Sequence, residues 1–538
     1  MIETGTDPRD VAAYLGEANL AQGRFAEARE WLGKQDFSPR TRAHGNHMLG
    51  RLEMESGNLP AAGQAFDRAL AAGGEAPELW VDIGRLRYRG GEQAQAIQAA
   101  ERAVELGPEN PLALRFRAQL VRDVDGSLAA LPWFERALDV APNDPALLGD
   151  YAATLGELGR ARDMLAAVRH LSTVDPANRR AYYLQAVLAA RAGNYDLALT
   201  LLQRSGQVES EVPGAMLLLA LIDMERGNYS SAAQMLDRLA TLQPDNRRVV
   251  PLLARALVLG RNDKELAYRF QADAARASAS PYLQTLMARS LEALGDRERA
   301  GPLLDLAARQ NRPEFSVIRS ATTLETARMR ADEGGTGVPA LTRAALTAGR
   351  SEAATEAARS FARRFPGSGD ALVLVGDTET SAKRLAAAEK AYLQALQIRR
   401  PWPLTFKLAS VLSGQGKQRD AVVLLAGFAQ GEPGNVEAMT LLAMHHARMG
   451  DWRAAAEYCD LVIAFGAARD PQVLAVRAKA ALESGETDLA VRLAEIAHDL
   501  QPMHPASASI LAQAYRAAGY DDDLVALAEA KVRILEQN

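Results

Sequence analysis

Glycine recurs at intervals of 34 residues through the first part of this chain. Seven of the nine positions in this register are glycine, although only 41 of the 538 residues are glycine overall. The register comprises Gly23, Gly57, Gly91, Gly159, Gly193, Gly227 and Gly295, with Asp125 and Arg261 at the two remaining positions. Each position separates two apolar runs of helical spacing, so a helix must end there and the chain must reverse with a positive φ. The spacing therefore predicts one tandem array of helical hairpins.

A second register, seven residues before the turn, holds only small residues. Its members are Gly16, Gly50, Gly84, Ala118, Ala152, Ala186, Ala220, Ala254 and Ala288. A small side chain at one place on the first helix of every hairpin predicts that neighbouring helices approach closely there. Five residues after the turn, alanine dominates again, and an apolar residue follows one helical turn later. These positions are expected on the buried face of the second helix.

The clearest single copy begins at Trp80. It holds Trp80, Ile83, Gly84, Gly91, Ala96, Ala103 and Pro108 at the spacing of the tetratricopeptide consensus. The sequence thus resembles the tetratricopeptide-repeat family over nearly the whole chain. This resemblance implies an all-α fold, in which about 15 helix-turn-helix units stack into a right-handed superhelical α-solenoid. It also implies a concave groove whose usual occupant is a protein or a peptide.

The register breaks after Pro313. The next segment, Glu314 to Asp332, reads as one unpaired helix, which would reverse the alternation of the two helix types and create a hinge. A loop follows at Gly334, Gly335 and Gly337. Three parts are therefore expected: an N-terminal array at 1–313 with about nine repeats, a degenerate junction at 314–338, and a C-terminal array at 339–538 with about six repeats. The last repeat, with three consecutive aspartates from Asp521, is expected to be a solvent-facing cap.

The composition fits closely packed helices and argues against several classes of function. The chain is 48% hydrophobic but only 6% aromatic, and its net charge of −5 provides no field that would attract nucleic acid. The single cysteine, Cys459, excludes an internal disulfide and a thiolate metal cluster. Cys459 stands where the repeat requires an apolar residue, so we expect a buried side chain rather than a nucleophile.

The start of the chain, MIETGTDPRD, lacks the basic and apolar regions of a secretory signal, and no run of apolar residues is long enough to cross a membrane. As written, the chain is expected to be cytoplasmic with no membrane insertion. Repeat material begins close to Met1 without a preceding capping helix, which stacked repeats disfavour. The alternative is therefore a periplasmic or envelope protein whose signal or lipobox lies upstream.

Catalytic and cofactor motifs are missing from the sequence. It contains no GxGxxG, Walker loop, HExxH, paired CxxC or GxSxG motif, so we expect no enzymatic activity and no cofactor. His44 and His47 are three residues apart but lack a third metal ligand. Asp123 and Asp125 resemble the start of a calcium loop without its final glutamate, which favours a simple turn. His445 and His446 are read as ordinary helix residues, so no metal site is predicted.

The resemblance also implies where a partner would bind. In this family the concave wall is formed by first-helix positions three before, and one and four after, the small residue. In the early copies these positions hold His47, Arg51, Arg85, Tyr88, Arg115, Gln119 and Arg122, and in the middle copies Tyr183, Leu217, Leu221 and Met224. A basic section followed by an apolar one predicts a partner segment with acidic residues beside apolar anchors. The alternatives are that the arginines are solubilising surface and that the apolar residues are core.

The asparagine required by the carboxylate clamp of chaperone-binding members is missing. The corresponding positions hold Glu17, Arg51, Arg85, Gln119 and Ala153, so a chaperone C-terminus is not the expected partner. The leading prediction is a non-catalytic bacterial adaptor or scaffold. The alternative is an envelope protein that helps to assemble or export a surface polysaccharide, a pilus or a lipoprotein. A repeat-bearing glycosyltransferase or a transcription regulator would need further non-repeat residues, which this chain does not contain.

Overall fold

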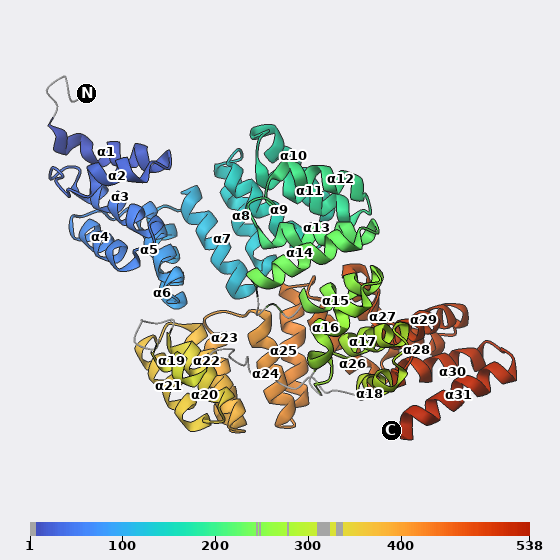
Figure 1. The fold of residues 1–538 in the computed structure, drawn as a ribbon. Helices are drawn as coiled ribbons and strands as arrows, with labels where there is room; N and C mark the ends of the chain where they lie inside the picture. The colour runs from blue at the N-terminus through green and yellow to red at the C-terminus, as the bar shows by residue number, and fades with distance from the viewer. Residues whose placement is uncertain are drawn as a thin grey trace. The chain divides into compact units, whose positions relative to one another are not determined.

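The computed structural model describes residues 7–243, 246, 249–276, 279–308, 323–329 and 337–537. Within these residues the secondary structure is helical, and no strand occurs (Figure 1). Antiparallel hairpins are formed by α1/α2, α3/α4, α5/α6, α7/α8, α11/α12, α13/α14, α15/α16, α17/α18, α20/α21, α22/α23, α26/α27, α28/α29 and α30/α31, and α19 packs against α20. The all-α solenoid of about 15 helix-turn-helix units predicted from the register is confirmed. The chain divides into two compact units, which we describe separately.

Unit 1 comprises residues 1–147 and 317–421. Its helices are α1 (Pro8–Ala21), α2 (Phe25–Leu32), α3 (Arg42–Glu55), α4 (Leu59–Ala71), α5 (Pro77–Arg89), α6 (Gln93–Leu106), α7 (Pro111–Asp125), α8 (Ser127–Val140), α19 (Leu324–Met329), α20 (Gly337–Thr347), α21 (Ser351–Arg364), α22 (Gly369–Ser381), α23 (Leu385–Leu396) and α24 (Trp402–Gly414). Many of these helices start at an Asn, Asp or Ser N-cap or have proline in the first turn, as at Asn110 before Pro111. The local sequence therefore fixes where the hairpins begin.

Unit 2 comprises residues 148–316 and 422–538, and its two boundaries fall within α9 and α25. Its helices are α9 (Pro145–Glu157), α10 (Ala161–Val174), α11 (Arg179–Arg191), α12 (Tyr195–Ser205), α13 (Pro213–Glu225), α14 (Tyr229–Leu242), α15 (Val249–Leu259), α16 (Asp263–Ala274), α17 (Pro281–Ala293), α18 (Arg297–Ala308), α25 (Gln418–Gly431), α26 (Val436–Arg448), α27 (Trp452–Val462), α28 (Pro471–Glu483), α29 (Thr487–Leu500), α30 (Pro505–Ala517) and α31 (Asp522–Gln537). A π-helical turn, η2 (Ile463–Ala467), follows α27.

The turn register has the backbone conformation that its glycines predict. All seven register glycines have φ between +71° and +83°, the left-handed region that glycine enters without steric cost. Arg261, which replaces glycine in the eighth copy, adopts the same conformation with φ +56°, and Lys383 does so with φ +58° in the later array. Where the register holds Asp125, the next residue, Gly126, takes the positive φ of +97°. The turn therefore requires a positive φ even at positions where the residue is not glycine.

The small-residue register lies at tight contacts between helices. A Cβ atom added to Gly50 would lie 2.3 Å from the Phe66 ring, and one added to Gly376 would lie 2.2 Å from the Tyr392 ring. The alanines of the register, such as Ala118 and Ala220, are fully buried. The expected close approach of a neighbouring helix at the small residues of the first helix is thus confirmed.

Of the predicted junction, the structure describes α19 and the start of α20 at Gly337. Most of the expected helix from Glu314 to Asp332, together with Gly334 and Gly335, lies outside the described residues. The two units each combine residues from both predicted arrays. The boundaries at 314–338 and the hinge therefore stay predictions.

In unit 1, a polar contact joins two segments that are far apart in the sequence. The amide of Gln93, at the start of α6, accepts a hydrogen bond from the Gly369 N–H at 2.9 Å and donates one to Asp370 at 3.0 Å. The Ala94 N–H donates to the Gly367 carbonyl at 3.1 Å. Gln93 is buried, and both ends of its amide are bonded. These bonds tie the α21–α22 loop to the turn between α5 and α6.

In unit 2, residues from the later part of the chain likewise contact helices from its earlier part. The glycine at Gly434 lies against the last turn of α9, where a Cβ would be 2.3 Å from the Glu157 carbonyl oxygen. The buried Gln501 side chain donates to the Ala307 carbonyl at 3.5 Å. Cys459 is fully buried in an apolar cluster of this unit with Met439. The prediction of a buried cysteine is confirmed, and burial raises the pKa of its thiol to about 12.

Candidate functional site

Three residues of the predicted basic section converge on one carboxylate that the register did not reveal. His47 on α3 hydrogen-bonds to Asp82 on α5 at 2.9 Å, and Arg85 donates to the other oxygen of Asp82 at 3.0 Å. Arg51 lies 3.5 Å from the same carboxylate. Asp82 is 4% exposed and His47 is 7% exposed, so the centre of this cluster is shielded from solvent.

The electrostatics of the cluster favour an ionised Asp82. Burial alone would raise the pKa of Asp82, but the hydrogen bond from His47 and the charges of Arg85 and Arg51 outweigh it and hold the pKa below its usual value. An ionised Asp82 offsets part of the positive charge that the sequence placed here. Because Asp82 orients all three side chains, fewer of their donor groups are available to an acidic ligand.

Tyr88 also has an internal partner in unit 1. Its hydroxyl donates to Asp123 at 2.7 Å, and Arg399 approaches the same carboxylate at 3.6 Å. Burial and the bond to Asp123 raise the pKa of Tyr88 to about 12. Arg399 also forms an ion pair with Asp370 at the start of α22, next to the α21–α22 loop. The predicted turn at Asp123 is wrong, because this residue lies in the last turn of α7, where its carboxylate bonds within unit 1.

The remaining basic-section residues lie on α7. Arg115, Gln119 and Arg122 are all partly exposed there. Each also interacts with other residues of the chain.

The predicted apolar section lies in unit 2 and its members differ in exposure. Met224 on α13 is 5% exposed and belongs to the hydrophobic core, and Leu217 packs against the same cluster while partly exposed. Leu221, between them, is 38% exposed. Tyr183 on α11 is half-buried, and burial raises its pKa. Within this section the surface is thus formed by Leu221 with the exposed parts of Leu217 and Tyr183.

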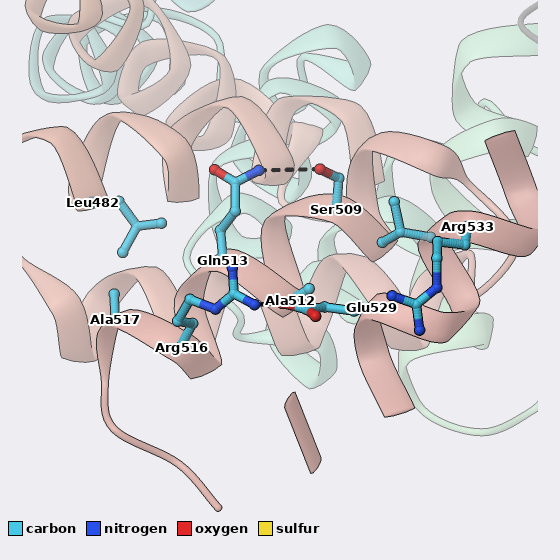
Figure 2. Close-up of a pocket in the computed structure, with 9 residues that line it drawn as sticks. Leu482, Ser509, Ala512, Gln513, Arg516, Ala517, Glu529 and Arg533 are labelled. Atoms are coloured by element: carbon cyan, nitrogen blue, oxygen red, sulfur yellow. Dashed lines mark hydrogen bonds and ion pairs between the residues drawn. The ribbon is translucent and has the colours of Figure 1, made fainter. Parts of the chain in front are cut away.

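A pocket of about 590 Å³ lies near the C-terminal end of unit 2, between α28, α30 and α31 (Figure 2). Its lining residues are Leu482, Ser509, Ala512, Gln513, Arg516, Ala517, Glu529, Val532 and Arg533. Three of them occupy the groove positions of the last repeat: Ser509 is three before, Gln513 one after and Arg516 four after the small residue Ala512. The sequence rule that gave the early residues would have found these three as well. The contributions of Glu529, Val532 and Arg533 follow only from the packing of α31.

The polar side chains of this pocket are held in place by one another. Gln513 donates to the Ser509 hydroxyl at 3.0 Å and accepts from Lys479 at 2.9 Å. Arg516 is ion-paired with Glu529 (Figure 2). Arg533 is exposed and has no ion-pair or hydrogen-bond partner among the described residues. The pocket therefore contains one arginine whose charge is not matched within the part of the chain that the structure describes.

The described residues hold no group of three metal-ligating side chains. His44 and His47 bond to different carboxylates, those of Glu17 and Asp82. His446 is stacked on Tyr458 and bonds to Asp451. No helix in the described parts of the chain has both the length and the continuous hydrophobicity needed to span a lipid bilayer.

Comparison with known families agrees with this architecture. Sequence profiles described as tetratricopeptide repeats match residues 47–111, 81–145, 147–208, 189–256 and 340–403. The chain belongs to the tetratricopeptide-repeat family. No curated protein sequence matches it.

Solved structures with a similar fold include several tetratricopeptide-repeat proteins. A repeat protein from Parabacteroides merdae is 20% identical, with 43% of this chain and 91% of that chain covered and a TM-score of 0.31. The Pseudomonas aeruginosa protein pilF is 19% identical, with coverages of 37% and 91% and a TM-score of 0.32. A chain of the APC/C heterotetramer Cut9-Hcn1 is 12% identical, with coverages of 89% and 98% and a TM-score of 0.31. At these identities the likeness concerns the fold alone.

Proposed function

We propose that this protein is a non-catalytic scaffold that binds a segment of a partner protein along the concave faces of its first helices. A tetratricopeptide-repeat fold is suited to protein–protein interaction, because each hairpin exposes one face of its first helix to a common surface. The observation that carries the proposal is the pocket in the last repeat, where all three groove positions, Ser509, Gln513 and Arg516, line one cavity.

Further candidate contacts lie on other first helices. In unit 2, Leu221 exposes an apolar side chain at a groove position. In unit 1, the candidates are Arg115, Gln119 and Arg122 on α7, whose side chains are partly exposed at groove positions. A mixture of apolar and basic contacts supports a partner segment that carries both apolar and acidic residues.

Site-specific photo-crosslinking in the native host tests this proposal. A photoreactive phenylalanine analogue would replace Gln513 or Leu221, and in matched controls Leu197 on α12 or Ile496 on α29, which are exposed apolar residues of second helices. We expect a common partner to be captured from the first-helix positions and not from the controls. Equal capture from both sets would refute groove binding. The identity of the partner then separates a general adaptor from a role in assembling envelope structures.

A further inference from the structure

The C-terminal pocket combines an apolar wall with a surplus of positive charge. Leu482, Ala512, Ala517 and Val532 supply the apolar part. The charged lining residues are two arginines and one glutamate, so the pocket has one more positive than negative group. Its size lies within the range of ordinary ligand pockets. A ligand that complements this lining carries a carboxylate next to an aliphatic group.

The surplus charge belongs to Arg533. Arg516 is paired with Glu529, whereas Arg533 lines the pocket from α31 (Figure 2). A guanidinium presents a planar set of donors that matches a carboxylate, and such charge-assisted hydrogen bonds are about twice as strong as neutral ones. An acidic ligand group would give Arg533 the partner that the fold does not provide.

Ser509 adds a second donor to the lining of the pocket. Its oxygen accepts a hydrogen bond from the Gln513 amide, so the proton of its own hydroxyl is left to be donated to a ligand. Gln513 is in turn fixed by Lys479. Because these side chains are already ordered, a ligand would not have to supply the cost of ordering them.

We propose that this pocket recognises an acidic side chain of the partner segment, with Arg533 as its main contact and an adjoining aliphatic side chain against Leu482 and Val532. The inference rests on the proposed function. Arg533 lies on a second helix, outside the groove positions of the family, so this recognition is a property of how the last hairpin of this chain is packed.

Fluorescence anisotropy with two synthetic decapeptides tests the inference. In the first, aspartate alternates with leucine, and in the second, asparagine replaces every aspartate. The full-length chain is titrated as wild type, as Arg533→Gln and as Arg492→Gln, a matched control at an exposed arginine of α29. We expect the acidic peptide to bind more tightly than the amide peptide, and Arg533→Gln to weaken it by about tenfold, the usual effect of losing one charge-assisted hydrogen bond. Arg492→Gln should change neither affinity.

Three results would overturn the inference. They are equal binding of the two peptides to the wild type, an equal loss for both peptides in Arg533→Gln, and displacement of the acidic peptide by free succinate at an equal concentration. Circular dichroism of Arg533→Gln checks that the variant is folded. Capture of a partner through Gln513 in the crosslinking experiment, together with any of these results, would leave the scaffold function standing and reject only the acidic ligand.

Discussion

The two units are built from the same repeat but differ in how many buried carboxylates they contain. Of the six buried carboxylates among the described residues, unit 1 contains Glu53, Asp82, Asp377 and Glu379, and unit 2 contains Asp150 and Asp223. In unit 1 these groups bind basic side chains of neighbouring helices. Lys407 and Tyr392, for example, both bond to Asp377, at distances of 2.6 to 2.7 Å.

In unit 2, Asp150 accepts a similar bond from Arg180 of the next first helix at 2.6 Å, but other groups of this unit face solvent. Leu221 is exposed on α13, and the pocket beside α30 contains Arg533 with its charge unmatched. We therefore expect that polar side chains bonded across neighbouring repeats hold a unit together, and that exposed side chains without such bonds are available to a partner. The following predictions test this division.

The largest effect is expected for Asp82→Ala in unit 1. The substitution leaves the buried His47 and two arginines without their shared acceptor, which should cost about 3 kcal/mol of folding free energy. Urea denaturation of the full chain should show a destabilised transition, while binding of the acidic peptide to the pocket of unit 2 should be unchanged. Glu105→Ala, at an exposed surface pair, serves as the control. Loss of peptide binding at a urea concentration where the variant is folded would contradict the division between the units.

The next effect concerns the close contact at Gly376. In Gly376→Ala the new Cβ would overlap the ring of Tyr392, which is fully buried and bonded to Asp377, so we expect a loss of about 2 kcal/mol in thermal or chemical denaturation. Gly427→Ala, inside α25, provides the matched control, because a Cβ there meets no neighbour. It should stabilise the protein by about 0.5 to 1 kcal/mol. The same sign for both substitutions would show that the Tyr392 network does not limit the packing.

A smaller effect is expected at the two turns that lack glycine. Arg261→Gly in unit 2 and Lys383→Gly in unit 1 should each raise the stability by about 1 kcal/mol, because a left-handed conformation is strained for a side chain. Gly193→Ala should have the opposite sign. Since the strain is local, the two gains should be equal, and the denaturation curves of the two variants measure this. A gain in only one unit would indicate that the turns are coupled to the surrounding packing.

The smallest effect concerns pH and should distinguish the units. Burial lowers the pKa of His504, and burial together with Lys531 and Arg289 lowers the pKa of His498, both in unit 2. In the unfolded chain these two histidines therefore bind protons more readily than in the folded chain. The folding stability that depends on their neutral form is fully present above pH 6.5 and is lost as the pH falls from 6.5 to the folded-state pKa. Because the pKa of Asp82 is lowered, the ionised carboxylate stabilises unit 1 until the pH falls below about 3.8.

Pulse labelling of Cys459 measures this pH effect, because the only thiol of the chain lies in the core of unit 2. At a fixed urea concentration, labelling should increase between pH 7.5 and pH 5.5. A variant with both His498→Gln and His504→Gln should show a flatter pH profile. An unchanged profile in that variant would assign the pH dependence to other groups.

Much of the candidate surface could be read from spacing, but its electrostatics could not. The rule that selected His47, Arg51 and Arg85 applies equally to Ser509, Gln513 and Arg516, which line the pocket. It does not reveal Asp82, because a residue two places before the small register faces a neighbouring repeat whose side chains are 35 positions away in the sequence. Met224 satisfied the same rule and is buried, since exposure at a groove position depends on how closely the next hairpin packs.

The sequence by itself determined the helix type, the turns and the sites of close packing, because these depend on interactions within a hairpin or between successive hairpins, and a 34-residue period repeats them. Only the tertiary structure decided that Gln93 is bonded to Gly369 and Asp370, residues more than 270 positions away. It also decided which arginines have a carboxylate partner and that Arg533, which has none among the described residues, lines a pocket. Such pairings depend on distances between side chains of separate helices, and no periodic pattern along the chain encodes those distances.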